Sequence, residues 1–597
     1  MRPVRPIRLL VGAAVLATAT VGAVTAPAGA DDQQDSQSKT VAIGTGGAVA
    51  TIDPTASQAG IDVLRKGGNA VDAAVTVAAV LSVTEPWVES LGGASYLLFY
   101  DRREQEAGVI GDRTPAPKTF GPDDRVGLAG SGARSVGVPT TLVSWQKALD
   151  RYGTISLREA LQPAIRIARE GFVVDANFQL IANSRNFKAF TSSRKLFLDD
   201  NLQPPQIGSV FRNPDLAATY ELIAEKGVDA FYRGPIGQAI VDTVQHPPLA
   251  GDAGSYVVAA ATSPGKLELS DIEDYRQPTP PPTKIKYRGY HIYSSPPPES
   301  GGTTVGEALN ILERYDLSGP DRALALHRVL EASKLSYADR ARYVGDPRFV
   351  DVPLSGLLSQ GFADERGCLI GDTALQGPVS YGDPTPPYDK KCSTPEAGVS
   401  EPGEEHSTHH FSVVDQWGNA VSYTGTLVSA GGSGVTVPGY GFMLNNELTN
   451  FNAAPLYDGD PNLAAGGKRP RGNMAPTIVV RDGRPVLTVG VAGGQTIQTT
   501  VLSLLVGYLD FGQSLPEALA DGRVSQRNTA VTQAETAFRD AYAPELEARF
   551  GHRFTGGASI AVAQGVSIDR DGRLVAVADT RRAAGAAGDA RVVSPAG

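Results

Sequence analysis

Thr408 lies where a charged, Pro- and Gly-rich stretch changes directly into the alternating pattern of a β-strand. A Thr hydroxyl is a weak nucleophile at neutral pH and needs a neighbouring base to take its proton. If the bond after Ser407 is cut, the new α-amine of Thr408 supplies that base, because its reference pKa of about 7.7 to 8.0 leaves part of it unprotonated near pH 7. The junction therefore favours a precursor that cleaves itself and becomes an amidohydrolase with an N-terminal Thr nucleophile. The alternative is that Thr408 only begins a strand, a position that Thr favours.

The residues around this junction raise the alternative of a metal site, because they include Glu404, Glu405, His406, His409 and His410. The histidines are spaced i, i+3 and i+4, which gathers side chains on one face only in a helix. The residues that follow alternate as in a strand, so this spacing does not favour a shared metal ion. We expect neither a metal nor an organic cofactor, since a Thr with its own amine needs none.

The elements that must position Thr408 change type at the junction. Before it the periodicity is mainly helical, with helices predicted over 55–66, 70–83, 157–169 and 321–343 and strands over 46–52 and 94–100. After it strands dominate, over 411–415, 420–428, 477–481 and 485–491 and in a hairpin over 567–579. A helix-rich piece followed by a strand-rich piece suggests two intertwined parts of one layered α/β fold.

Residues 1–30 have the pattern of a secretory signal peptide. Three arginines precede an apolar run, and Ala28-Gly29-Ala30 forms a cleavage site of the A-x-A type. That run is too short for a membrane span, and so is the apolar run over 70–83, which we interpret as a buried core helix. We therefore expect a protein that is secreted, or associated with the cell envelope, and has no membrane span.

The chain has 597 residues and a net charge of -10. Because no basic run follows the signal, nucleic acid and anionic membrane surfaces are not expected as partners. Residues 371–407 are rich in turn formers and charges and are predicted to be a flexible linker without packed core elements. Cys368 and Cys392 lie in or beside it, and in an exported protein they are most simply a disulfide.

Several segments, taken in order along the chain, resemble the γ-glutamyltransferase family, also called γ-glutamyltranspeptidase or glutathione hydrolase. They are Gly67-Gly68-Asn69-Ala70-Val71-Asp72-Ala73-Ala74, Leu91-Gly92-Gly93, Tyr287-Arg288-Gly289-Tyr290, Pro296-Pro297-Pro298-Glu299-Ser300-Gly301-Gly302 and Tyr337-Ala338-Asp339-Arg340. The resemblance implies an α/β (α+β) fold of the N-terminal nucleophile hydrolase type, a four-layer αββα sandwich. It also implies self-cleavage between Ser407 and Thr408 into a large subunit, 31–407, and a small catalytic subunit, 408–597, which stay together as a heterodimer.

The resemblance also assigns roles. Thr408 matches the nucleophile, which forms a γ-glutamyl acyl-enzyme and passes the acyl group to water or to an amino acid or peptide amine. Thr426 matches a Thr that hydrogen-bonds near the nucleophile, and Gly493-Gly494 matches the pair that stabilises the oxyanion. Arg113 matches the Arg that binds the substrate α-carboxylate, for which a guanidinium fork is suited. The plainer interpretations are a strand residue for Thr426, a turn for the glycines and a solvated ion pair for Arg113.

Several substrate-binding positions depart from the family pattern. Glu447 matches a contact to the substrate α-amine, but Asn450 stands where the family usually has Asp. Gly472 and Asn473 stand where a serine pair helps to hold the α-carboxylate, and Val428 replaces a usual Asn. We therefore expect the α-carbon groups of the substrate to be bound less tightly.

The stretch 451–468 is shorter than in family members that have a lid over the site. A shorter lid leaves the cleft open, which admits bulkier acyl donors and more water and favours hydrolysis over transfer.

We predict a γ-glutamyl transpeptidase or hydrolase that cleaves glutathione and other γ-glutamyl compounds. The first alternative keeps the Thr mechanism with another acyl group, as in a cephalosporin-acylase-like or poly-γ-glutamate-acting enzyme. The second is a secreted binding protein that is never cut. Hydrolysis of γ-glutamyl and glutaryl anilides distinguishes the first two, and an uncut chain indicates the third.

Overall fold

The computed structural model describes residues 39–121, 123–124, 130–388, 396–401, 407–557, 559–581 and 588–593. The predicted signal peptide over 1–30, His406 of the possible metal group and Cys392 of the predicted disulfide lie outside these ranges.

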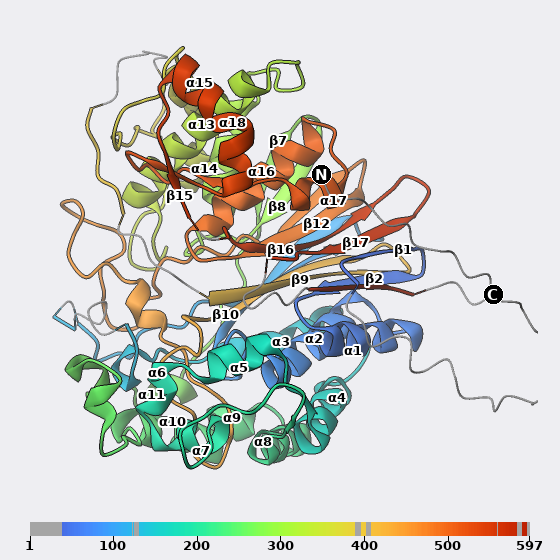
Figure 1. Cartoon of the computed structure of the whole chain (residues 1–597), viewed down its shortest axis with the longest axis vertical. Coiled ribbons are helices and arrows are strands. Elements are labelled where there is room, and N and C mark those ends of the chain that lie inside the picture. The colour runs from blue at the N-terminus through green and yellow to red at the C-terminus, as the bar shows by residue number, and fades with distance from the viewer. Residues whose placement is uncertain are drawn as a thin grey trace, which may run out of the picture. The chain divides into compact units, whose positions relative to one another are not determined.

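Two antiparallel sheets form the centre of the fold (Figure 1). The six-stranded sheet consists, in spatial order, of β18 (Asp589–Val592), β2 (Gly47–Thr51), β9 (Ser407–Asp415), β10 (Ala420–Val428), β3 (Ala94–Asp101) and β4 (Glu106–Asp112). The seven-stranded sheet consists of β1 (Val41–Gly44), β17 (Leu574–Ala578), β16 (Val562–Ile568), β12 (Arg484–Ala492), β11 (Thr477–Arg481), β8 (Tyr290–Ser294) and β7 (Thr283–Tyr287). Both sheets therefore combine strands from before and after the Ser407–Thr408 bond.

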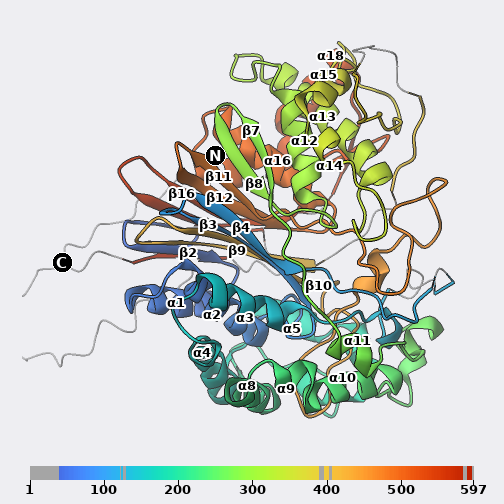
Figure 2. The same ribbon diagram turned by 180° about the vertical axis from the view of Figure 1, so that it is seen from behind.

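Helices cover the outer side of each sheet, as the two opposite views in Figures 1 and 2 show. On the side of the six-stranded sheet lie α1 (Pro54–Arg65), α2 (Ala70–Thr84), α3 (Thr141–Tyr152), α4 (Leu157–Glu170), α5 (Ala176–Ala182), α6 (Arg185–Lys188), α7 (Thr191–Phe197), α8 (Pro214–Lys226), α9 (Asp229–Tyr232), α10 (Pro235–Gln245) and α11 (Leu269–Glu273). On the other side lie α12 (Gly301–Leu312), α13 (Arg322–Tyr343), α14 (Leu354–Leu357), α15 (Gln360–Gly367), α16 (Thr496–Leu509), α17 (Leu515–Ala520) and α18 (Thr536–Phe550). The predicted αββα order of layers is confirmed.

Short elements connect these layers. They are the small strands β5 (Phe172–Val173), β6 (Val210–Phe211), β13 (Val524–Ser525), β14 (Thr532–Ala534) and β15 (Phe554–Gly556), and the 3-10 turns η2 (Ala133–Ser135), η3 (Ala253–Ser255), η4 (Ala259–Thr262) and η5 (Glu447–Asn450). Of these, η5 carries two of the predicted substrate-binding residues.

The two sheets face each other across an apolar layer. Leu98 and Val414 of the six-stranded sheet and Ile478 and Val566 of the seven-stranded sheet belong to one buried cluster. Alternation along a strand sends every second side chain into this layer and the others toward the helices, so the central strands can be buried on both faces. This explains why nearly all residues of β9 and all residues of β10 are buried, polar ones included.

Helix α2 illustrates how the sequence specifies its own element. Asn69 caps the helix by accepting from the N–H groups of Val71 and Asp72 at 2.9 and 3.0 Å, and Asp72 Oδ2 accepts from Asn69 N at 2.9 Å. All residues of α2 are buried, as expected for a helix that is apolar on every side. The predicted core helix over 70–83 is confirmed. No helix among the described residues has the length and apolar character needed to cross a membrane.

Between residues 371 and 401 the described part of the predicted linker forms no helix or strand, but one of its residues belongs to a core cluster. Val379 is 3% exposed, belongs to the cluster beneath α12 and α16, and forms an isolated bridge with Ala397. Asn528 fixes it, accepting from Val379 N at 2.8 Å and donating to Val379 O at 3.0 Å. A side-chain amide has both a donor and an acceptor, so it can bond the N–H and the C=O of one extended residue. Asn528 thus satisfies the backbone groups of Val379 that a neighbouring strand would otherwise bond. Cys368, just before this stretch, takes part in a disulfide.

Candidate functional site

Ser407 and Thr408 are the first two residues of β9, and Thr408 lies directly opposite Thr426 of β10. The two side-chain hydroxyl oxygens are 3.3 Å apart. The strand predicted from residue 411 thus begins earlier, at Ser407. The bond predicted to be cut lies between two residues of β9 that are both paired with β10, so the reacting groups have defined positions before any cleavage.

The hydroxyl of Thr426 is aimed at that bond. Its oxygen accepts a hydrogen bond from Val428 N at 2.8 Å and donates to the carbonyl oxygen of Ser407 at 2.9 Å. A hydrogen bond to a carbonyl oxygen stabilises the negative charge that develops there during nucleophilic attack. Thr426 therefore does more than fill a strand position.

Val428 distorts β10 beside the same bond. The pairing register shifts between Thr426 and Val428, which lies opposite Ser407, and the φ angle of Val428 is 84°. A β-branched residue rarely adopts positive φ, and such a conformation costs about 1 to 3 kcal/mol. Asn tolerates this region better, so the departure from the family pattern at this position places backbone strain next to the predicted cleavage site.

Gly493 and Gly494 connect the end of β12 to the start of α16, with φ angles of 151° and 59°. A Cβ atom on Gly493 would lie 2.7 Å from Ala561 Cβ, so a larger residue does not fit. Their position before a helix N-terminus favours binding of negative charge by backbone N–H groups. This geometry suits the predicted oxyanion role.

One pocket collects most of the predicted site residues. It is lined by Arg113, Thr408, Thr426, Val428, Asn450, Asn473, Met474, Gly494 and Ile497. Gly493, Glu447 and Gly472 are not part of this lining but adjoin it. Gly493 precedes Gly494, Gly472 precedes Asn473, and Glu447 accepts a hydrogen bond from Asn450 Nδ2 at 3.0 Å.

Arg113 is the cation of this pocket and is itself 2% exposed. Its guanidinium forms ion pairs with two fully buried carboxylates, Glu447 and Glu299, and the distance from Arg113 Nη1 to Glu299 Oε1 is 3.2 Å. Burial raises the pKa of the Glu299 carboxyl, while the charge of Arg113 opposes this rise. The solvated ion pair that was the plainer interpretation of Arg113 is wrong, because all three groups are in the interior.

Other side chains of the protein contact the positions of Gly472 and Asn473, where the family usually has a serine pair. A Cβ atom on Gly472 would lie 2.2 Å from both carboxylate oxygens of Glu299, so a side chain at this position requires the Glu299 carboxylate to move. Asn473 Oδ1 accepts from Arg340 Nη2 at 2.5 Å. Neither position offers a hydroxyl, as a serine pair would. In addition, Glu299 fills the space beside Gly472, and Asn473 is already bonded to Arg340.

A larger cavity, of about 410 Å³, adjoins this pocket and shares Asn450 and Asn473 with it. One of its walls is the start of the stretch 451–468, which folds back on itself: Asp460 Oδ2 accepts from Asn452 Nδ2 at 2.7 Å and from Leu456 N at 2.9 Å. Ligand pockets commonly measure about 300 to 1,000 Å³. The cavity is therefore large enough for a leaving group or an acyl acceptor.

The histidines after Thr408 point in different directions. His409 Nε2 lies 2.6 Å from Glu89 Oε2, and Gly425 leaves space for this contact. His410 lies against the other sheet, with Nδ1 2.9 Å from Thr424 Oγ1, and burial holds its pKa well below the usual value. Adjacent residues on a strand face opposite sides, so these two rings do not share a metal ion.

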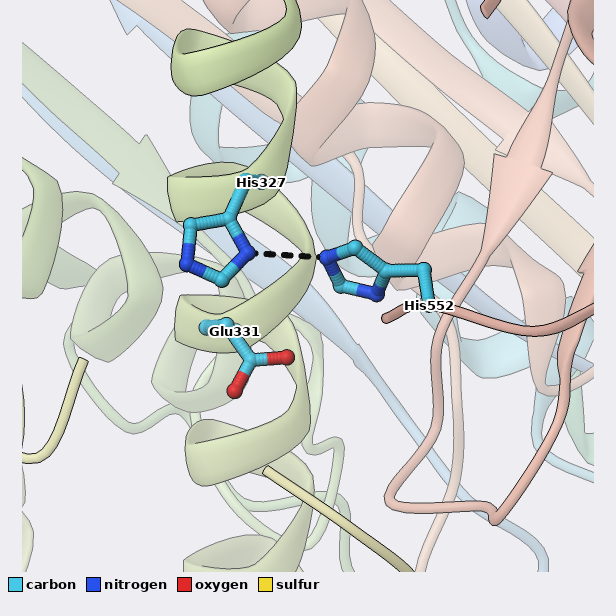
Figure 3. A group of neighbouring side chains, drawn as sticks. All are labelled: His327, Glu331 and His552. Atoms are coloured by element: carbon cyan, nitrogen blue, oxygen red, sulfur yellow. Dashed lines mark hydrogen bonds between the residues drawn. The ribbon is translucent and has the colours of Figure 1, made fainter. Parts of the chain in front are cut away.

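The group of described side chains that could hold a metal is elsewhere, at His327, Glu331 and His552 (Figure 3). Its ligand atoms lie within 4.8 Å of one another. Two ring nitrogens already bond each other, His327 Nδ1 to His552 Nε2 at 2.9 Å, and Glu331 Oε2 accepts from Leu375 N at 2.8 Å. We interpret the group as a hydrogen-bonded junction between α13 and the segment after α18.

Glu299 is the site residue that sequence reasoning missed. The sequence places it in a segment that resembles the family and indicates no role for it. The available signal was its position as an acidic residue between Pro298 and Ser300, directly before the glycine-rich start of α12. Its contact with Arg113 depends on the approach of two distant segments, which no local pattern reveals.

Comparison with known proteins identifies the family of the chain. A family model described as Gamma-glutamyltranspeptidase matches residues 56–589. The chain is similar to the glutathione hydrolase proenzyme of Bacillus subtilis (strain 168), with 37% identity over 564 residues and 92% coverage of each chain. It is also similar to the acylase ACY 1 proenzyme of Pseudomonas sp. (strain V22), with 34% identity and coverage of 90% of this chain and 93% of the relative. The solved structure of cephalosporin acylase from Bacillus halodurans has a TM-score of 0.79 at 26% identity, covering 96% of this chain and 100% of that one. The chain belongs to the γ-glutamyltranspeptidase family.

Proposed function

We propose that the chain cuts its own Ser407–Thr408 bond and that the freed Thr408 then cleaves γ-glutamyl amides through a covalent acyl-enzyme. The observation that carries this proposal is the hydrogen bond from Thr426 to the carbonyl oxygen of Ser407, 2.9 Å long, with the Thr408 hydroxyl beside it. A polarised carbonyl next to a hydroxyl is what an intramolecular attack needs.

Maturation proceeds in two steps. Thr408 Oγ1 attacks the Ser407 carbonyl carbon, the C–N bond to Thr408 breaks, and the hydroxyl proton passes to the released nitrogen, which becomes the α-amine of Thr408. Water then hydrolyses the ester that remains, which leaves a carboxylate on Ser407 and a free hydroxyl on Thr408. The product carries a nucleophile and its base on one residue.

Turnover repeats the same chemistry on a donor amide. The α-amine takes the proton of the Thr408 hydroxyl as its oxygen attacks the amide carbon, and the proton then goes to the leaving amine. Gly493 and Gly494 provide backbone N–H groups for the oxyanion of each tetrahedral intermediate. Water or an acceptor amine finally attacks the acyl-enzyme, giving hydrolysis or transfer.

The subunits follow from the position of the cut. We propose a large subunit of 31–407 and a small catalytic subunit of 408–597 that remain associated. We also propose that residues 1–30 direct export and are removed. The support is their arginines, their apolar run and their A-x-A-type site.

A second candidate function uses the same nucleophile on another acyl group. It is supported by the relatives named acylase and cephalosporin acylase.

The test combines the cut with the activity. The purified protein should give two bands on a denaturing gel, with the smaller beginning at Thr408, and should hydrolyse γ-glutamyl-4-nitroanilide. Thr408→Ala should stay uncut and inactive, whereas Thr408→Ser, which keeps a hydroxyl, should still be cut. An uncut wild-type chain, or normal turnover by Thr408→Ala, overturns the proposal. Faster release from glutaryl-4-nitroanilide, with none from the γ-glutamyl donor, supports the acylase alternative.

A further inference from the structure

We infer that the pocket beside Thr408 recognises the ammonium group of an acyl donor and does not require a carboxylate on the same carbon, because Glu299 already provides the carboxylate that faces Arg113. The inference rests on the proposed function and extends its donors from γ-glutamyl amides to amides of ω-amino acids. The donor that tests it is the 4-aminobutyryl group, which is a γ-glutamyl group without its α-carboxylate.

The position of Glu299 is built into the fold. Its side chain is fully buried, Oε2 accepts from Met474 N at 2.7 Å, and Oε1 lies 3.2 Å from Arg113 Nη1. The backbones on either side are paired, with Gly472 N donating to Pro298 O at 3.0 Å. A hydrogen bond and an ion pair therefore hold the Glu299 carboxylate beside Arg113.

The same carboxylate excludes a side chain at residue 472. Both oxygens of Glu299 lie 2.2 Å from the place of a Cβ atom on Gly472. A hydroxyl at this position and the Glu299 carboxylate are thus mutually exclusive. In this chain the Glu299 carboxylate fills the space that the neutral hydroxyl of a serine at residue 472 would need.

The local charges decide which donor group is accepted. One guanidinium, Arg113, faces two carboxylates, Glu299 and Glu447. A substrate carboxylate placed here would be a third anion around one cation, and like charges in a buried site repel strongly. A substrate ammonium instead balances the charge of the three groups.

An acceptor for that ammonium is present. Glu447 Oε1 is engaged by Arg113 and by Asn450 Nδ2, but the buried Oε2 has no hydrogen-bond partner among the described residues. A buried carboxylate oxygen without a partner costs free energy, which a bound cation recovers. Because residue 450 is Asn and not Asp, it adds no further negative charge.

The neighbouring cation, Arg340, favours the ionised form of Glu299 but is not available to a substrate. Its Nε donates to Ser300 Oγ at 2.8 Å, its Nη2 donates to Asn473, and its Nη1 pairs with Glu401. Arg340 is therefore committed to partners within the protein and offers no free fork for a substrate carboxylate.

The experiment compares kcat/KM for three 4-nitroanilides: γ-glutamyl, 4-aminobutyryl and glutaryl. The wild-type enzyme should process the 4-aminobutyryl donor at least as efficiently as the γ-glutamyl donor, and the glutaryl donor least of all. Glu299→Gln removes the charge with little change in shape, and Glu299→Ser combined with Gly472→Ser replaces the carboxylate by hydroxyls. Each should raise the ratio of γ-glutamyl to 4-aminobutyryl efficiency by about tenfold or more, since a like-charge contact is removed.

Glu307→Gln is the matched control, because Glu307 is a buried carboxylate on α12 outside the pocket. It should leave the donor ratio unchanged. Each variant is first checked for the two bands of the cut chain, so that a folding defect is recognised.

The outcomes separate the two proposals. A wild-type preference of about tenfold or more for γ-glutamyl over 4-aminobutyryl, or a ratio unmoved by both Glu299 variants, overturns this inference and leaves the proposed function intact. No release from any of the three donors by a correctly cut chain overturns the proposed function itself.

Discussion

At the scale of single residues, the site depends on the direction of one hydroxyl proton. Thr426 Oγ1 is contacted by Val428 N, by the Ser407 carbonyl oxygen and by Thr408 Oγ1. The N–H of Val428 can only donate and the carbonyl can only accept, so the Thr426 proton is committed to the carbonyl. The proton of Thr408 then points to Thr426, which leaves the Thr408 oxygen available for attack.

Thr426→Val should therefore slow self-cleavage. The variant keeps the shape of the side chain and loses the hydrogen bond to the Ser407 carbonyl, and the loss of one such donor costs about a hundredfold or more in rate. The measurement is the fraction of uncut chain on denaturing gels over time after synthesis. Thr424→Val, on the same strand, removes a hydroxyl that contacts His410 and should be cut at the normal rate. Equal rates for the two variants would contradict the role given to Thr426.

At the scale of elements, α13 is tied to the segment after α18 by the group His327, Glu331 and His552 (Figure 3). Burial raises the pKa of the Glu331 carboxyl to about 7 and lowers the pKa of His552 to about 3. Both shifts disfavour the charged forms, as expected for groups removed from water. At neutral pH the junction thus holds neutral imidazoles beside a carboxyl that is only partly ionised.

Glu331→Gln should stabilise the protein more at pH 8 than at pH 5. The folded-state pKa of Glu331 is raised from 4.5 to about 7, so its contribution to stability is present below the unfolded-state pKa and is lost as the pH rises through 7. Gln can still accept from Leu375 N and carries no charge. The expected gain in the free energy of unfolding at pH 8 is on the order of 1 to 3 kcal/mol.

Thermal unfolding at the two pH values measures this effect. Glu104→Gln, at an exposed turn after β3, is the control and should show no such pH-dependent gain. A gain for Glu331→Gln that is equal at both pH values, or larger at pH 5, would contradict this explanation. It would show that burial of the ionised Glu331 carboxylate does not destabilise the folded protein at pH 8.

At the scale of the whole molecule, the predicted cut does not divide the structure into two bodies. In the six-stranded sheet, β2 lies between β18 and β9, and β10 pairs with β3. In the seven-stranded sheet, β17 pairs with β1 and β11 pairs with β8. Strands from both sides of the cut are therefore hydrogen-bonded neighbours in each sheet.

The two fragments should remain together after cleavage. Under native conditions we expect one peak in size-exclusion chromatography, and the protein from this peak should give two bands on a denaturing gel. In urea we expect one cooperative unfolding transition, because the fragments share the core between the sheets. The uncut Thr408→Ala chain is the control for the position of the peak. Separation of the fragments in native buffer, or two transitions in urea, would contradict the interleaved arrangement.

Local patterns were sufficient for much of the fold. The strands over 420–428 and 477–481 match β10 and β11 residue for residue, and the capped apolar run over 70–83 is α2. These elements are specified by side-chain period and by caps, which are local properties of the chain. The position of Thr408 at the end of a turn-rich stretch is local as well, but it was the resemblance of segments along the chain to a known family that favoured the nucleophile over a simple strand residue.

The contacts of the pocket were decided only by the tertiary structure. Arg113, Glu299, Glu447 and Gly472 lie far apart in the chain, and nothing in the residues around Arg113 indicates that two carboxylates meet it. The burial of Val379 in the linker has the same origin, because it depends on the distant Asn528. The physical reason is that pairing and burial of charges depend on which segments pack together, and that follows from the whole core rather than from any one stretch.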